Sequence, residues 1–293
     1  MNFQIERLKQ LPLHPKETWQ GGLVRAPGWI VGEERKPYRT WMALWVSVKE
    51  GFVHHSEPMP PEERNFSLVF NSLVDFACDQ KLAGYVPGKV EVLDAALAEH
   101  LSGLLAETGI QVVQRQKLIY LDRVIEDMIQ HFCQGTPVPG ALETKGVTLE
   151  MMQAFAEAAS RFYQAQPWQH LSDEDLIEIE EPFVDDKLRY VTVMGQGGQT
   201  YGLSFFRSRQ QYDSMYELEP EEFFSQNEEV WSLTFDEIMD MPIADADLWE
   251  DHELAVAGDK AYPVALSFGR RGKYRRPGPH LLAFMEGLLL ALA

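Results

Sequence analysis

The densest run of positive charge in the chain lies near its C-terminus, in FGRRGKYRRPGP. The run contains Arg270, Arg271, Lys273, Tyr274, Arg275 and Arg276. Just upstream, residues 171–260 carry 24 Asp and Glu against five Lys and Arg. Guanidinium groups bind carboxylates and phosphates through paired hydrogen bonds. The run therefore predicts either capture of an anionic ligand or acidic protein surface, or an internal clasp with the chain's own acidic segment.

A second candidate chemistry is metal-dependent hydrolysis with carboxylates near Asp94. Asp94 follows an expected strand over residues 89–93 and precedes an expected helix. This order of elements resembles a ribonuclease H-like core, in which carboxylates from the first strand, a helix and a later strand end hold two Mg²⁺ ions. The first-strand position falls near Ser47, in WVSVKEG, and only Asp75 remains to join Asp94. If this resemblance is real, we expect the nuclease chemistry to be absent, and we expect Asp94 to be a helix N-cap.

Two further patterns have simpler structural interpretations. The glycines of MGQGGQTYG (194–202) lead from one expected strand into another, so they predict a hairpin turn and not a phosphate loop. The stretch DADLWEDHE (245–253) has neither a calcium-loop glycine nor a spaced histidine pair, so it predicts a solvated acidic face. No nucleophile elbow, phosphate-binding motif or zinc-protease motif occurs. We predict no catalytic residue, no metal and no cofactor.

The elements that must position these residues fall into two groups. Residues 1–40 are rich in Pro, Gly and Trp and predict an extended arm with one short strand. Residues 41–135 alternate between strand and helix patterns, which is typical of an α/β module. Residues 136–146, with their Pro and Gly, predict a linker. Residues 147–293 predict an α+β domain in which helices pack on an antiparallel sheet. The overall expectation is an α+β fold in two domains.

Charge and hydropathy limit the classes of partner and location. The formal net charge is −19, and residues 151–293 carry 26 acidic and 11 basic residues. Such a charge repels phosphate backbones and disfavours nucleic acid as a partner. The longest apolar stretch, residues 281–293, is about a dozen residues long and contains Glu286, whereas a membrane span needs about 20. We expect a cytoplasmic protein that does not bind a membrane.

Several longer segments carry a family resemblance. They are AQPWQHLSDEDLIEIE, YVTVMGQGGQTYGLSFF, LWEDHELAVAGDKAYP and RRPGPHLLAFMEGLLLAL. With them the chain resembles a family of two-domain bacterial proteins of unknown function, over most of residues 20–293. The resemblance implies an N-terminal α/β module joined to a C-terminal α+β module. It implies no activity and no catalytic residues.

These observations favour a non-catalytic binding or regulatory protein whose basic loop docks an anionic ligand or an acidic protein surface. The alternative is a metal-dependent hydrolase of the nuclease or phosphatase type, with carboxylates near Asp94. A third interpretation is a homo-oligomer in which the basic loop of one copy docks on the acidic face of a neighbour. Surface ion pairs weaken as salt screens them, so that assembly would be salt-sensitive.

Overall fold

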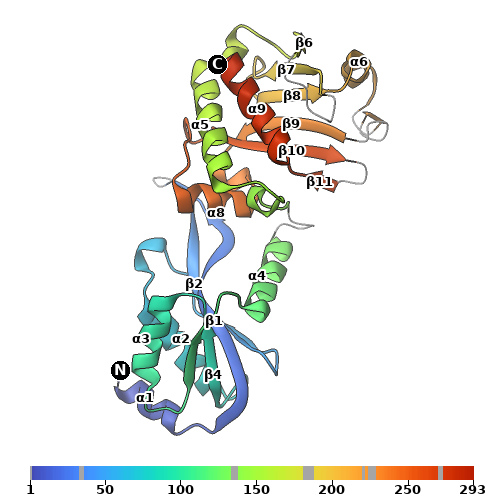
Figure 1. Ribbon diagram of the computed structural model, residues 1–293. Helices are drawn as coiled ribbons and strands as arrows, with labels where there is room; N and C mark the ends of the chain where they lie inside the picture. Colours follow the sequence, from blue (N-terminus) through green and yellow to red (C-terminus); the bar gives the residue numbers. More distant parts are fainter. Residues whose placement is uncertain are drawn as a thin grey trace. The chain divides into compact units, whose positions relative to one another are not determined.

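The computed structural model describes residues 2–32, 36–132, 138–180, 188–219, 222–223, 229–269 and 273–293. The chain divides into two compact units, residues 1–136 and 137–293 (Figure 1). Each unit has its own sheet, and the two sheets together with the helices make the protein α+β, as expected.

The first unit contains a mixed five-stranded sheet. Its elements are α1 (Asn2–Lys9), β1 (Leu13–Ile30), β2 (Tyr38–Ser47), β3 (Val53–His55), η1 (Pro61–Glu63), α2 (Phe66–Cys78), β4 (Val86–Val92), α3 (Ala95–Leu105), β5 (Gln111–Gln114) and α4 (Ile119–Phe132). The strand order is β3-β2-β1-β4-β5. The first three strands are antiparallel, whereas β4 and β5 run parallel to β1.

Side-chain alternation gives this sheet two buried faces. Ala43 and Trp45 on β2 point into the core formed with α2 and α3. The neighbouring Leu44 and Val46 point to the opposite face, where Leu118 and Leu121 at the start of α4 cover them (Figure 1). Residues of β1 and β2 are thereby held between helices on both sides.

The expected extended arm over residues 1–40 is corrected by the structure. This segment holds α1 and β1, and β1 is the central strand of the sheet. The glycines that suggested an arm serve close packing. A Cβ on Gly21 would lie 2.2 Å from the ring of Trp45, its partner on β2. Glycine inside a strand often marks such a close approach, and the sequence pattern alone does not distinguish it from a loop.

The second unit contains an antiparallel six-stranded sheet. Its elements are η2 (Ala141–Glu143), α5 (Leu149–Ala165), η3 (Pro167–Gln169), β6 (Ile177–Glu178), β7 (Tyr190–Met194), β8 (Tyr201–Phe206), α6 (Arg209–Glu217), β9 (Glu229–Asp236), η4 (Ile238–Asp240), α8 (Ile243–His252), β10 (Tyr262–Gly269), β11 (Lys273–Arg275) and α9 (Pro279–Leu292). The strand order is β11-β10-β9-β8-β7-β6, so β11 lies at one edge.

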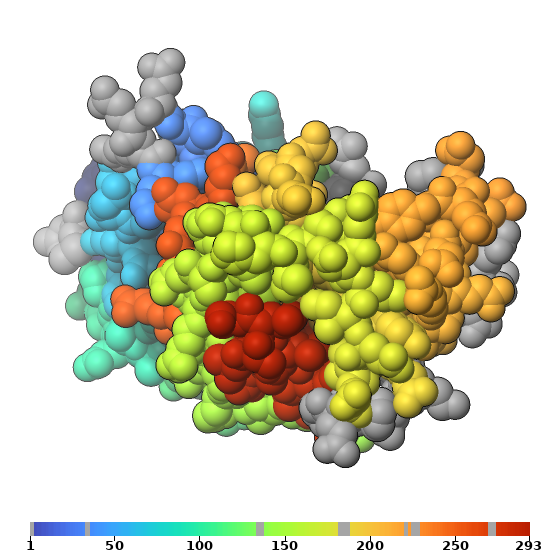
Figure 2. Space-filling view, turned by 90° about the horizontal axis from the view of Figure 1, so that it is seen from above, coloured from blue at the N-terminus to red at the C-terminus, as the bar shows by residue number. Residues whose placement is uncertain are grey.

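Helices α5 and α9 pack side by side on one face of this sheet (Figures 1 and 2). Phe162 of α5 stacks on Phe235 of β9, with ring centroids 5.8 Å apart. Phe284 of α9 meets Phe205 of β8. The odd-numbered residues of β9 from Trp231 onward are buried by this contact, which fixes the inner face of the sheet.

Local sequence features account for two details of this unit. The side chain of Thr148 caps α5 by accepting a hydrogen bond from the amide of Met151. The Gly-rich segment joins β7 to β8 as a hairpin, with positive φ at Gly195 and Gly198. Ala141, inside the expected linker, is instead buried, and η2 packs within the second unit.

Candidate functional site

The described part of the basic run is an edge strand and not only a loop. β11 pairs with β10, so that Arg275 lies opposite Ser267 and Tyr274 lies opposite Phe268. Arg270 and Arg271 lie outside the described residues, as does the side chain of Lys273. An edge strand leaves one row of backbone amides and carbonyls without a partner strand, which gives a binding segment access to them.

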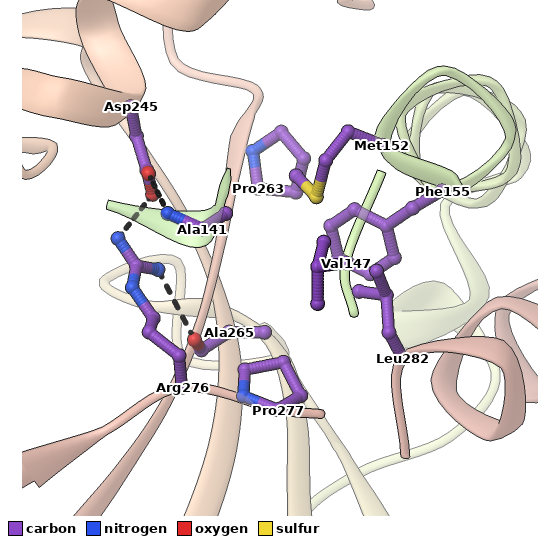
Figure 3. A pocket seen from close by; sticks show the side chains of 10 residues that line it. All are labelled: Ala141, Val147, Met152, Phe155, Asp245, Pro263, Ala265, Arg276, Pro277 and Leu282. Carbon is purple, nitrogen blue, oxygen red and sulfur yellow. Dashed lines mark hydrogen bonds and ion pairs between the residues drawn. The ribbon is translucent and has the colours of Figure 1, made fainter. Parts of the chain in front are cut away.

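Arg276 points into the second unit, away from any external ligand. Its Nε donates to the carbonyl of Pro139 at 2.7 Å, and its Nη1 donates to that of Ala265 at 3.2 Å. Its Nη2 forms an ion pair with Asp245 of α8 (Figure 3). The side chains of Arg276 and Asp245 are 4% and 2% exposed. The internal clasp is therefore present and buried at this member of the run.

Asp245 is the acidic half of that clasp. Its other oxygen accepts the amide of Ala141 at 2.8 Å. Burial raises the pKa of Asp245, against the lowering effect of Arg276 and the Ala141 amide. The expectation of a solvated acidic face over residues 245–253 is thus wrong for Asp245, because α8 turns this side chain inward.

A small cavity borders the Arg276–Asp245 pair. Figure 3 shows the pair on one side and apolar side chains, including Met152, Phe155 and Leu282, on the other. Its volume is about 10 Å³, which is room for about one water molecule. This cavity cannot hold an organic ligand, and the pair acts as a structural anchor.

Arg275 has the opposite environment from its neighbour. Its side chain is 73% exposed, and its Nη1 lies 3.3 Å from Oε1 of Glu229, at the start of β9. Arg207, directly after β8, places Nη2 3.0 Å from Oε2 of the same carboxylate. The hydroxyl of Ser267 also donates to Glu229, at 3.3 Å. Two guanidiniums thus converge on one carboxylate at the end of the sheet.

An exposed aromatic pair adjoins this cluster. The rings of Phe268 and Tyr274 meet edge to face, with centroids 5.2 Å apart. Phe268 is 38% exposed and Tyr274 is 40% exposed. Because consecutive strand residues point to opposite faces, the aromatic pair lies on one face of the hairpin and Arg275 on the other. The hairpin thus offers aromatic contacts on one face of the edge strand and a cationic contact on the other face.

In the first unit, Asp94 acts as the expected N-cap. Its Oδ1 accepts the amide of Leu97 at 2.9 Å, at the first turn of α3. Asp75 is exposed on α2, which covers the face of the sheet opposite to Glu91. The structure therefore does not bring Asp75 and Asp94 together as a metal-binding pair.

The buried carboxylate nearest to Asp94 along β4 is Glu91. Its Oε2 accepts a hydrogen bond from the side-chain amide of Gln20 at 3.0 Å. Its Oε1 accepts hydrogen bonds from Nε and Nη2 of Arg115, at 3.0 and 2.8 Å. Burial alone would raise the pKa of Glu91, but the donors Gln20 and Arg115 outweigh it and lower the pKa. Glu91 is therefore an ionised carboxylate, and each of its two oxygens already accepts hydrogen bonds from the protein.

Gln20 stands on β1 beside Glu91, where a second carboxylate would be needed for a metal pair. Its side-chain oxygen accepts the amides of Tyr120 and Leu121, at 2.9 and 3.3 Å, and so caps α4. The sequence interpretation missed this position because it took residues 41–48 for the first strand. Within the described ranges, no group of three or more His, Cys, Asp or Glu side chains is placed to hold a metal ion.

Family models match each of the two units separately. One, described as a domain of unknown function (DUF6930), matches residues 4–129. Another, described as a domain of unknown function (DUF7309), matches residues 153–273. The chain joins two distinct domains of unknown function. No curated protein matches this chain.

Solved structures resemble the chain only weakly. The catalytic core domain of HTLV-2 integrase in complex with magnesium is 14% identical, with a TM-score of 0.28, over 44% of this chain and 78% of that one. A simian T-cell lymphotropic virus intasome in complex with the PP2A regulatory subunit B56 gamma is 13% identical, with a TM-score of 0.29, over 44% and 45%. TM-scores this low say nothing about the chemistry of either domain.

Proposed function

We propose that this protein is a non-catalytic binding protein whose DUF7309 domain docks an acidic segment of a partner protein on the β10–β11 hairpin. The exposed guanidinium of Arg275 is the observation that carries the proposal, because it is the described cation of the run that faces solvent. Arg270, Arg271 and Lys273 belong to the same proposed surface by sequence.

Charge contrast supports this choice of partner. The chain as a whole carries a net charge of −19, so the basic hairpin is a local exception on an acidic molecule. Such an exception steers an acidic segment toward one place, while the remaining surface repels it. The aromatic rings of Phe268 and Tyr274 add apolar contact area on the other face of the same edge strand.

The hydrolase alternative has less support from the first unit. Asp94 is engaged as a helix cap, and Glu91 is held by Gln20 and Arg115. An amide at position 20 cannot supply the negative charge that a second metal-binding carboxylate would provide. These contacts favour a structural role for the polar groups of the DUF6930 domain.

None of the helices in the described part of the chain is both long enough and apolar enough to span a bilayer. We propose an acidic protein segment as the partner and the cytoplasm as the location.

Charge reversal at Arg275 tests the proposal, with a fluorescein-labelled octaglutamate peptide as the probe. We expect Arg275→Glu to weaken binding at least about tenfold, because an attraction becomes a repulsion. Arg123→Glu, an exposed change of equal charge on α4 of the first unit, is the matched control and should have little effect. Equal losses in the two variants, or none in either, would refute the hairpin as the docking site. Arg276 is unsuitable for this test because its reversal disrupts a buried pair.

A further inference from the structure

Glu229 occupies the position that an acidic ligand would take between two arginines. We propose that Arg207 and Arg275 form a two-arginine site for a carboxylate of the partner's acidic segment, and that Glu229 fills this site until the segment binds. The inference rests on the proposed function, and it adds Arg207 and Glu229 to the docking surface.

The geometry of the cluster supports a carboxylate as the ligand. Arg207 contacts Oε2 of Glu229 at 3.0 Å, and Arg275 contacts Oε1 at 3.3 Å. The two guanidiniums are therefore spaced to bridge the two oxygens of one carboxylate. An aspartate or glutamate side chain of a partner has the same shape and charge as the group already bound there.

The environment allows this exchange. The side chains of Arg207 and Arg275 are 40% and 73% exposed and that of Glu229 is 11% exposed, so water, salt and a partner's carboxylate reach these pairs from the arginine side. The Arg276–Asp245 pair, with both side chains at most 4% exposed, has no such access. Two guanidiniums facing one carboxylate also leave a net positive charge, which attracts further acidic residues.

The test removes the internal competitor. With the labelled octaglutamate peptide, Glu229→Gln should bind about tenfold more tightly than the native protein, because both arginines become available. Adding Arg207→Gln to that variant should reverse the gain. Arg123→Gln serves as the control for a lost surface cation and should leave the affinity unchanged.

Several outcomes would overturn the inference. A folded Glu229→Gln variant with unchanged or weaker peptide affinity would show that Glu229 only supports the hairpin; loss of binding in Arg275→Glu would still uphold the proposed function. A gain for inorganic phosphate without a gain for the peptide would overturn the carboxylate assignment. Dimerisation of Glu229→Gln without peptide, seen by light scattering, would assign the site to a second copy of the chain.

A second variant keeps the test valid if Glu229→Gln does not fold. Glu229→Asp keeps the charge but shortens the side chain by one methylene, so that it can no longer reach both arginines equally well. A gain in peptide affinity smaller than tenfold is expected for this variant. The absence of any gain in a folded Glu229→Asp protein would overturn the inference.

Discussion

Arg275 and Arg276 are adjacent in the chain and have opposite environments. Arg275 is mostly exposed and shares Glu229 with Arg207, whereas Arg276 is buried against Asp245. In the sequence, nothing distinguishes the expected environments of the five basic residues within these seven positions. Arg275 is the last residue of the edge strand β11, opposite Ser267, whereas Arg276 follows the strand and turns toward Asp245.

Breaking the buried pair should be more costly than removing it. Asp245→Asn leaves the guanidinium of Arg276 in the interior without a counter-charge, and we expect a loss of about 3–5 kcal/mol in the free energy of unfolding. The double variant Asp245→Leu with Arg276→Met should lose much less, because neither charge is buried. Urea unfolding of Asp245→Leu, of Arg276→Met and of the double variant measures this coupling. Additive losses would contradict the account.

Glu91 predicts a contribution to stability that depends on pH. Its pKa is lowered in the folded protein, so the stability that it contributes is present above the pKa of the unfolded chain and is lost as pH falls through the folded pKa. Arg115→Gln should reduce this contribution and move acid unfolding to higher pH. Because Arg115 is 47% exposed, we expect about 1 kcal/mol or less at neutral pH. Acid unfolding of the native protein and of Arg115→Gln measures this shift. An equal midpoint pH in the two proteins would contradict the prediction.

At the scale of elements, the polar network around Gln20 attaches α4 to the sheet. A side chain on the central strand β1 caps a helix that begins about a hundred residues later in the chain. Capping motifs that can be recognised in a sequence lie within a few residues of the helix start. A cap from a residue this distant in the chain therefore has no local sequence signature. The alternating strand and helix patterns of residues 41–135 predicted helices in this module, but they did not reveal what holds the first turn of α4.

Gln20→Ala should therefore loosen α4. We expect a loss of about 1–2 kcal/mol in stability and faster hydrogen exchange at the amides of Tyr120 and Leu121, which lose their acceptor. Gln130→Ala, an exposed change on the same helix, is the matched control. Unchanged exchange at both amides in Gln20→Ala would show that the cap does not contribute.

Gly21 provides a test of close packing inside β1. A Cβ there would lie 2.2 Å from the Trp45 ring and 2.5 Å from the carbonyl oxygen of Leu44, so Gly21→Ala should destabilise the protein by about 1–3 kcal/mol. Gly103→Ala, on the exposed side of α3 with open space around it, should instead stabilise by up to about 1 kcal/mol. Thermal unfolding of the two variants should show shifts of opposite sign.

At the scale of the whole molecule, much of the fold could be predicted from the sequence and much of the site could not. The strand and helix alternation of residues 41–135, the helices on an antiparallel sheet in residues 147–293, and the β7–β8 hairpin with its glycines were predicted from local patterns. The central strand β1 was missed because its glycines resemble those of a loop. The partners of Glu229, Gln20 and Asp245 were missed because contacts between distant strands and helices depend on register.

The two units should also be separable. Each has its own sheet and its own buried core, and residues 1–136 and 137–293 form distinct compact units. We expect each segment to fold when produced by itself, with a cooperative thermal transition followed by circular dichroism. Failure of either segment to show a transition would mean that its core depends on the other.

The central claim is that the β10–β11 hairpin docks an acidic segment, and a hydrogen-exchange footprint tests it most directly. Addition of the octaglutamate peptide should slow exchange in residues 262–276 and leave the DUF6930 domain unchanged. The protection should disappear in Arg275→Glu and weaken as salt is raised. Protection at α4 or elsewhere in the first unit, or no protection at all at saturating peptide, would contradict the account.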